Sequence, residues 1–129
     1  MKTHLLLIDD DIDEMKTFVE ALKEVVGAFK CTYAANGIHA LKMLLYLRPE
    51  AIFAACNMPA MNGLQVAEEV KKIEHLRDIP FFLYAPTFHS LTREKAFQLG
   101  ISGCLEKPST IAGLSILLKK VLPLPQEKT

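Results

Sequence analysis

Short apolar runs alternate along this chain with longer segments whose apolar residues recur every three or four positions. Uninterrupted apolar runs of about four to eight residues are typical of strands buried on both faces, and the wider spacing is typical of helices with one apolar face. The pattern therefore predicts strands and helices in strict alternation. The predicted strands are residues 5–8, 29–34, 51–56, 81–84 and 102–105.

Each predicted strand is followed by an amphipathic segment. In the first of these segments the apolar residues recur as on one face of a helix, and they are Ile12, Met15, Val19, Leu22 and Val26. Asp11 or Asp13 is expected to cap this helix. The other helices are expected around residues 38–45, 64–73, 91–99 and 111–121.

Apolar strands that alternate with helices imply a parallel sheet covered by helices on both faces. We therefore expect an α/β, flavodoxin-like three-layer sandwich with five parallel strands and five helices. In such folds functional sites form at the carboxyl ends of the strands. One domain is expected over residues 1–122, followed by a short Pro-rich tail at residues 123–129.

Composition and charge narrow the functional classes. Half of the residues are hydrophobic, and fifteen basic residues balance fifteen acidic ones, so the chain lacks the positive field that nucleic acids or anionic membranes attract. The apolar runs are too short to cross a bilayer, and the N-terminus is no signal peptide, which favours a cytoplasmic protein. Cys31, Cys56 and Cys104 lack metal-site spacing and are expected to be reduced thiols in or near the core.

Three short motifs lie at predicted strand ends: LLLIDDD at residues 5–11, NMPAMNG at 57–63 and LEKP at 105–108. In this order they resemble a response-regulator receiver domain. The resemblance implies a phosphoryl-transfer switch of two-component signalling. In that family an aspartate ending the third strand accepts the phosphoryl group and helps an acidic pair to hold Mg²⁺. A lysine after the fifth strand contacts the phosphoryl oxygens.

Two parts of that family site are retained. Asp9 and Asp10 match the acidic pair, and Lys107 matches the lysine. On their own the acidic residues would favour a helix N-terminus, but Lys107 at its expected place favours a site. Mg²⁺ would be left with Asp9, Asp10 and the backbone of Asn57, so we expect weak binding at most and no required cofactor. We expect Lys107 to pair with Asp9 or Asp10 instead.

Three other parts are missing. Ala55 stands at the phosphoacceptor position, Ala85 replaces the Ser or Thr that ends the fourth strand, and Cys104 replaces an aromatic residue on the fifth. A methyl group is neither a nucleophile nor a metal ligand. The three losses together predict a degenerate receiver in which small residues pack the former site. Tyr84, beside Ala85, is expected to do no more than pack.

These features predict a non-enzymatic, stand-alone interaction module that docks on a sensor kinase or another regulator without phosphorylation. Its predicted docking surface is the polar rim of the last two helices: Arg93, Glu94, Lys95, Gln98, Lys119 and Lys120. The family also allows a homodimer, but the sequence does not indicate whether this chain forms one.

Two alternative functions stay open. The first is a regulator phosphorylated elsewhere, on Asp10, Asp11 or a hydroxyl of Thr87, Ser90 or Ser109, although such an acceptor would be displaced from Lys107. The second is a small-ligand binder or enzyme at the strand-end crevice, which no catalytic motif supports.

Overall fold

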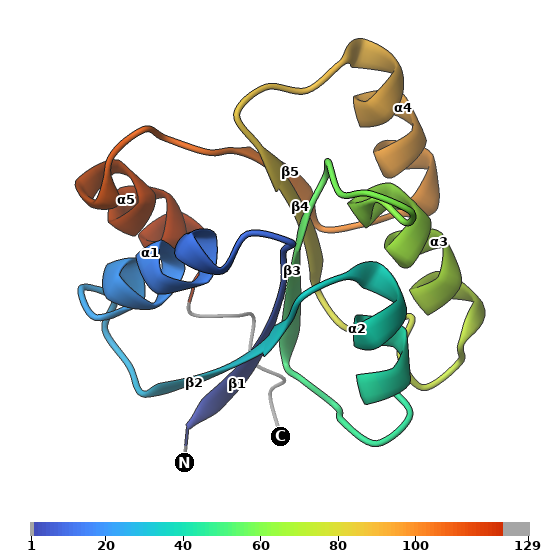
Figure 1. The fold of residues 1–129 in the computed structure, drawn as a ribbon, viewed down its shortest axis with the longest axis horizontal. Helices are drawn as coiled ribbons and strands as arrows, with labels where there is room; N and C mark the ends of the chain where they lie inside the picture. The colour runs from blue at the N-terminus through green and yellow to red at the C-terminus, as the bar shows by residue number, and fades with distance from the viewer. Residues whose placement is uncertain (1, 123–129) are drawn as a thin grey trace.

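A parallel sheet lies between two layers of helices in the computed structural model, which describes residues 2–122 (Figure 1). The strands are β1 (Thr3–Ile8), β2 (Phe29–Ala34), β3 (Ala51–Ala55), β4 (Phe81–Ala85) and β5 (Gly103–Glu106), in the order β2-β1-β3-β4-β5. The helices are α1 (Ile12–Leu22), α2 (Gly37–Met43), α3 (Gly63–Lys72), α4 (Ser90–Leu99) and α5 (Ile111–Val121). The predicted alternation and parallel sheet are confirmed.

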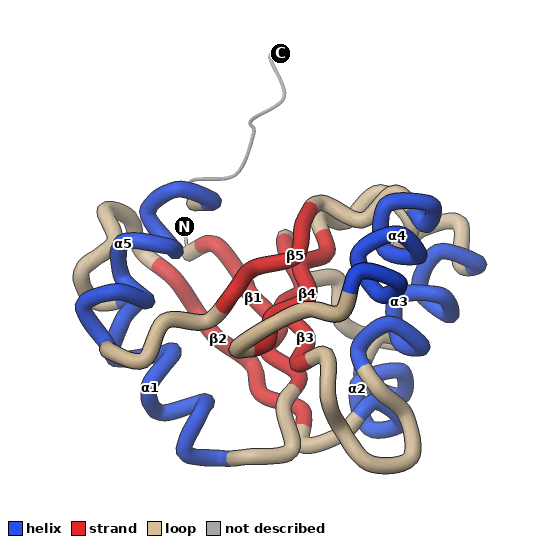
Figure 2. The backbone as a smooth tube through the Cα atoms, turned by 90° about the horizontal axis from the view of Figure 1, so that it is seen from above, coloured by secondary structure: helices blue, strands red, loops and turns tan. Residues whose placement is uncertain are grey.

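Each face of the sheet is covered by its own helices. α1 and α5 pack on one face, and α2, α3 and α4 pack on the other (Figure 2). Successive side chains of a strand point to opposite faces, so Leu6 and Ile8 join the core under α2–α4 while Leu5 and Leu7 join the core under α1 and α5. Burial on both faces explains why the central strands β1, β3 and β4 contain continuous apolar runs.

The apolar face predicted for α1 is partly wrong. Asp11 does cap the helix, since its side chain accepts a hydrogen bond from the Asp13 N–H at 2.9 Å. However, Ile12 is exposed, and Val26, beyond the helix, is 90% exposed. Leu22 is buried as predicted, and Met15 packs against the core, but the other buried residues are Phe18, Ala21 and Val25. Both sets repeat every three or four residues, and packing against α5 decides between them.

The segment after β3 is held against the end of that strand by a glycine. A Cβ atom at Gly63 would lie 2.4 Å from the backbone oxygen of Ala55, so only glycine fits there. Asn62 and Gln65 form a reciprocal capping box that starts α3 at this point. This loop therefore returns directly to the carboxyl edge of the sheet.

Two further expectations concern the C-terminal tail and membrane-spanning segments. The tail predicted at residues 123–129 lies outside the described residues, so the domain boundary remains a prediction. Among the helices of residues 2–122, none has the length and apolar character that a membrane span requires.

Candidate functional site

The retained and the missing site positions meet at the carboxyl edge of the sheet. A shallow pocket of about 200 Å³ at this edge contains Asp9, Ala55, Asn57, Ala85 and Lys107 among its lining residues. This juxtaposition is the one that the sequence predicts from the strand ends. Asp10 does not line the pocket and is exposed to solvent.

Asp9, directly after β1, is the most buried carboxylate of the site. It is 4% exposed, and one oxygen, Oδ1, accepts a hydrogen bond from the Asp11 N–H at 3.0 Å. The other oxygen, Oδ2, accepts a hydrogen bond from the Tyr84 hydroxyl. Burial raises the pKa of Asp9, and the hydrogen bonds from Tyr84 and Asp11 partly oppose this effect. Both oxygens of this carboxylate are therefore engaged within the chain.

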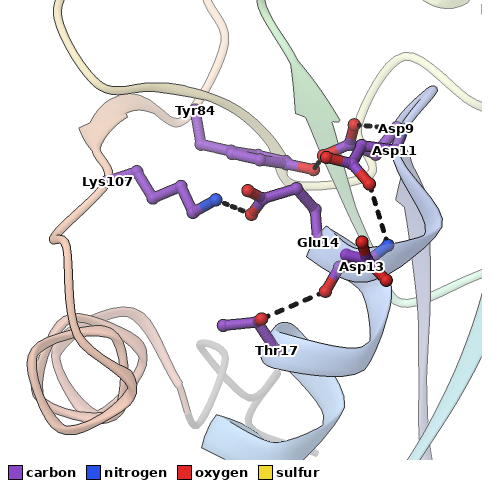
Figure 3. A network of polar contacts seen from close by, with 7 residues as sticks. All are labelled: Asp9, Asp11, Asp13, Glu14, Thr17, Tyr84 and Lys107. Carbon is purple, nitrogen blue, oxygen red and sulfur yellow. Dashed lines mark hydrogen bonds and ion pairs between the residues drawn. The ribbon is translucent and has the colours of Figure 1, made fainter.

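Tyr84 reaches Asp9 across a neighbouring strand. In the sheet register Tyr84 of β4 pairs with Ala55 of β3, and Asp9 lies one residue beyond the Ile8–Ala54 pair. Asp9, Ala55 and Tyr84 consequently form a row across three strands. The side chain of the middle member is only a methyl group, which leaves room for the tyrosine ring. Figure 3 shows the Tyr84 hydroxyl against the Asp9 carboxylate.

The interpretation of Tyr84 as a packing residue alone is thus wrong, because its hydroxyl donates to Asp9. Burial raises the pKa of Tyr84, and the hydrogen bond to Asp9 raises it further, which keeps the donor protonated. The sequence does place a tyrosine at the end of a strand. Which strand lies between Tyr84 and Asp9, however, depends on the sheet order, which is not a local property.

Lys107 forms an ion pair that the sequence analysis did not predict. Its ammonium group pairs with the carboxylate of Glu14, in the first turn of α1 (Figure 3). The two side chains are 18% and 31% exposed, respectively, so the pair is partly shielded from water. The predicted pairing of Lys107 with Asp9 or Asp10 is therefore wrong.

The physical reason lies in the neighbouring groups. Asp9 already accepts two hydrogen bonds, and Asp10 lies at the surface. Glu14 is carried toward Lys107 by the first turn of α1, where the Glu14 N–H donates to the Asp11 carbonyl at 3.1 Å. An acidic residue in the first turn of the helix after the acidic motif is the only signal in the sequence that points to it.

The other two altered positions are occupied by packed small side chains. Ala85 is buried at the end of β4. Cys104, on β5, packs against the core under α2–α4, and burial raises its pKa. All three cysteines are free and half-buried, and burial raises the pKa of Cys31 to about 11. Their free, half-buried state agrees with the predicted reduced thiols in or near the core.

Comparison with known proteins identifies the family of this chain. The family model "Response regulator receiver domain" matches residues 5–119. The chain belongs to this family. As a receiver domain it is a module of two-component signalling, and such modules interact with histidine kinases and other regulators.

Relatives of this receiver domain occur both as short chains and within longer proteins. Chemotaxis protein CheY-3 of Vibrio cholerae is 28% identical over 120 residues, which cover 93% of this chain and 92% of CheY-3. Transcriptional regulatory protein PrrA of Mycobacterium tuberculosis is 26% identical over 118 residues, 92% of this chain but 49% of PrrA.

Solved structures confirm the flavodoxin-like receiver fold. The phosphorylated cyanobacterial phytochrome response regulator RcpA superposes with a TM-score of 0.85 at 19% identity, covering 94% of this chain and 91% of that one. The magnesium-bound receiver domain of sensor histidine kinase PA1611 from Pseudomonas aeruginosa gives a TM-score of 0.75 at 24% identity, covering 93% and 97%. At these sequence identities the structural similarity establishes the fold alone.

The residues of this receiver domain do not fit a divalent ion as they are arranged here. Mg²⁺ needs several hard oxygen ligands in an octahedral set. Both Asp9 oxygens accept hydrogen bonds, Ala55 offers no oxygen in its side chain, and the Glu14 carboxylate is paired with Lys107. Over residues 2–122, no cluster of three or more histidine, cysteine or acidic side chains has the arrangement of a metal site.

Proposed function

We propose that this receiver domain acts in two-component signalling as a protein-interaction module that works without phosphorylation. The observation that carries the proposal is Ala55, which is 7% exposed at the end of β3, in the row between Asp9 and Tyr84. Phosphoryl transfer to the end of this strand requires an oxygen nucleophile. The methyl group of Ala55 has none, and Tyr84 extends over it.

The polar groups around Ala55 support a single resting arrangement. The Tyr84 hydroxyl donates a hydrogen bond to Asp9, and the Glu14 carboxylate balances the positive charge of Lys107. Within residues 2–122, every buried side-chain nitrogen or oxygen has a hydrogen-bond partner. A site that satisfies its charges internally needs neither a metal ion nor a phosphoryl group to remain folded.

We further propose that the partner, a sensor kinase or another regulator, binds over α4, β5 and α5. The six rim residues predicted from the sequence are all exposed. They surround apolar side chains that the sequence analysis did not assign, including Phe97, which is 86% exposed, and Leu91. Arg93 pairs with Glu106 at 2.9 Å and lies 5.0 Å from the Phe88 ring centre. Aromatic and arginine side chains within a polar rim are typical of binding surfaces.

An acceptor elsewhere is less well supported. Asp10 and Asp11 are exposed beside the site, but a phosphoryl group on either would have to draw Lys107 away from Glu14 to reach its ammonium. No observation favours an enzyme or a small-ligand binder at the crevice over the receiver function. We therefore infer that the chain is not an enzyme.

The test is the intact mass of the protein after incubation with Mg²⁺ and acetyl phosphate. We expect no phosphoryl adduct on the natural chain. RcpA, whose phosphorylated form has been crystallised, serves as the positive control. A stoichiometric adduct on the natural chain would contradict the proposal, and fragment masses would then identify the acceptor among Asp10, Asp11 and the nearby hydroxyls.

The docking surface is tested separately, in a two-hybrid screen against the histidine kinases of the same genome. Phe97→Ala and Arg93→Ala should reduce the signal of a genuine partner, whereas Val26→Ala, an equally exposed apolar position outside this surface, should not. Equal signals for all three variants would show that α4 is not the docking surface.

A further inference from the structure

A second apolar surface lies on α2, separated from α4 by α3 (Figure 1). A groove of about 480 Å³ runs between α2 and the loop that connects β3 to α3. Its walls include Ile38, His39, Lys42, Pro59, Ala60 and Met61. Neither the retained site residues nor the proposed α4–α5 surface contributes to this groove.

The groove is built by close packing of α2 against the loop. A Cβ atom at Gly37 would lie 2.8 Å from Cγ2 of Val66 and 3.0 Å from Cγ of Met61, so glycine permits the approach. Asn36 begins α2 by accepting a hydrogen bond from the His39 N–H at 2.8 Å. Both walls are therefore fixed by contacts within the chain.

Exposed apolar side chains extend the groove along α2. Ile38 is half exposed, and the hydrogen-bonded turn after the helix carries Leu45 and Tyr46, the latter 91% exposed. Ile38 and Leu45 are separated by about two helical turns and so share one side. Large apolar side chains grouped on a protein surface are typical of interaction sites.

The charged side chain that lines this groove is basic. Of the residues that line the groove, Lys42 is positively charged and none is acidic. The groove thus has apolar walls with a lysine at its edge and no acidic residue in its lining, which is complementary to an acidic partner.

We propose that α2 and the β3–α3 loop form a second docking surface for an acidic, amphipathic segment of another protein. An apolar side chain of that segment enters the groove between Ile38 and Met61, and its carboxylates face Lys42. This surface adds a second partner to the module and does not depend on whether the domain is phosphorylated.

The experiment is an NMR titration of the isotope-labelled full chain with a synthetic helical peptide that has leucines on one face and glutamates on the other. We expect saturable shifts at Ile38, Lys42 and Met61. Lys42→Glu should raise the Kd by about fivefold or more, the effect of about 1 kcal/mol at a charged rim. Arg77→Glu, the same charge change at an exposed turn after α3, should leave the Kd unchanged.

A matched peptide with lysines in place of the glutamates provides the charge control. Equal binding of both peptides, shifts confined to α4 and α5, or no saturable shift would overturn the proposal. Self-association of the chain that Leu45→Glu abolishes would also overturn it, because a second copy would then cover this surface. Unchanged spectra of the variants outside α2 verify that they remain folded.

Discussion

The ammonium group of Lys107, after β5, pairs with the carboxylate of Glu14 in the first turn of α1. The pair joins α1 to the segment after β5, and both side chains line the same pocket as Asp9, Ala55 and Tyr84. In a receiver that uses phosphorylation, the corresponding lysine is expected to meet the phosphoryl oxygens. Here its charge is offset from within the chain, so the contacts at this edge of the sheet support one arrangement.

The coupling between Glu14 and Lys107 is measurable in a double-mutant cycle with Glu14→Gln and Lys107→Met. Because the pair is partly shielded, we expect a coupling free energy of about 1–2 kcal/mol in urea unfolding. The exposed pair Lys23–Glu20, at 3.0 Å, is the matched control and should couple by about 0.3 kcal/mol. Equal coupling for the two pairs would show that Glu14 does not hold Lys107.

Asp9→Asn should stabilise the protein at neutral pH by about 1 kcal/mol, because it removes a buried negative charge. The pKa of Asp9 is raised above 3.8 in the folded state by burial, so the folded state binds more protons than the unfolded state just above that value. Stability of the natural protein therefore falls as the pH rises through the folded-state pKa of Asp9.

The gain from Asp9→Asn should accordingly vanish in acid and grow as the pH rises. Urea unfolding of both proteins across the acidic to neutral range measures it. Asp10→Asn, at an exposed position, should stay within about 0.5 kcal/mol of the natural protein. A stability change that is independent of pH would mean that the charge of Asp9 is not the cause.

Ala55→Asp alone should destabilise the domain by about 2 kcal/mol, because the new carboxylate enters the space between Asp9 and the Tyr84 ring. Adding Tyr84→Val should recover part of that loss and free an Asp9 oxygen. We expect Mg²⁺ to stabilise this double variant by about 1.4 kcal/mol at ten times its Kd. Millimolar Mg²⁺ should leave the natural protein unchanged.

Chemical unfolding with and without Mg²⁺ measures both effects, and a Mg²⁺-free buffer of the same ionic strength is the control. If Mg²⁺ stabilised the natural chain as much as the double variant, the carboxylates now engaged by Tyr84 and Lys107 would be available to the ion. The proposed metal-independent arrangement would then be wrong.

Ala60→Gly should stabilise the domain by about 0.5–1 kcal/mol. Ala60 has a φ of 67°, inside a tight turn where the Met61 N–H donates to the Pro59 carbonyl at 2.7 Å. An L-residue with a side chain is strained in this region, and glycine is not. Gly100→Ala is the reverse control, since Gly100 has a φ of 72° with no atom near its missing Cβ. It should lose a similar amount, and a loss at Ala60 as well would contradict the argument.

Most of the architecture was predictable because it depends on local patterns. The strand predicted at residues 51–56 is observed as Ala51–Ala55, and the helix predicted around residues 91–99 is observed as Ser90–Leu99. The meeting of Asp9, Ala55 and Lys107 followed as well, since the carboxyl ends of parallel strands lie at one edge. The sequence by itself therefore determined the fold class, the place of the site and the alanine at the end of β3.

Only the tertiary structure decided which side chains meet. The burial of Phe18 rather than Ile12 depends on how α1 packs against its neighbours. The bond from Tyr84 to Asp9 requires β3 to lie between their strands, with a methyl group in the row. The choice of Glu14 for Lys107 depends on where α1 lies relative to the end of β5. Each of these contacts joins residues far apart in the chain, and local periodicity carries no information about such distances or directions.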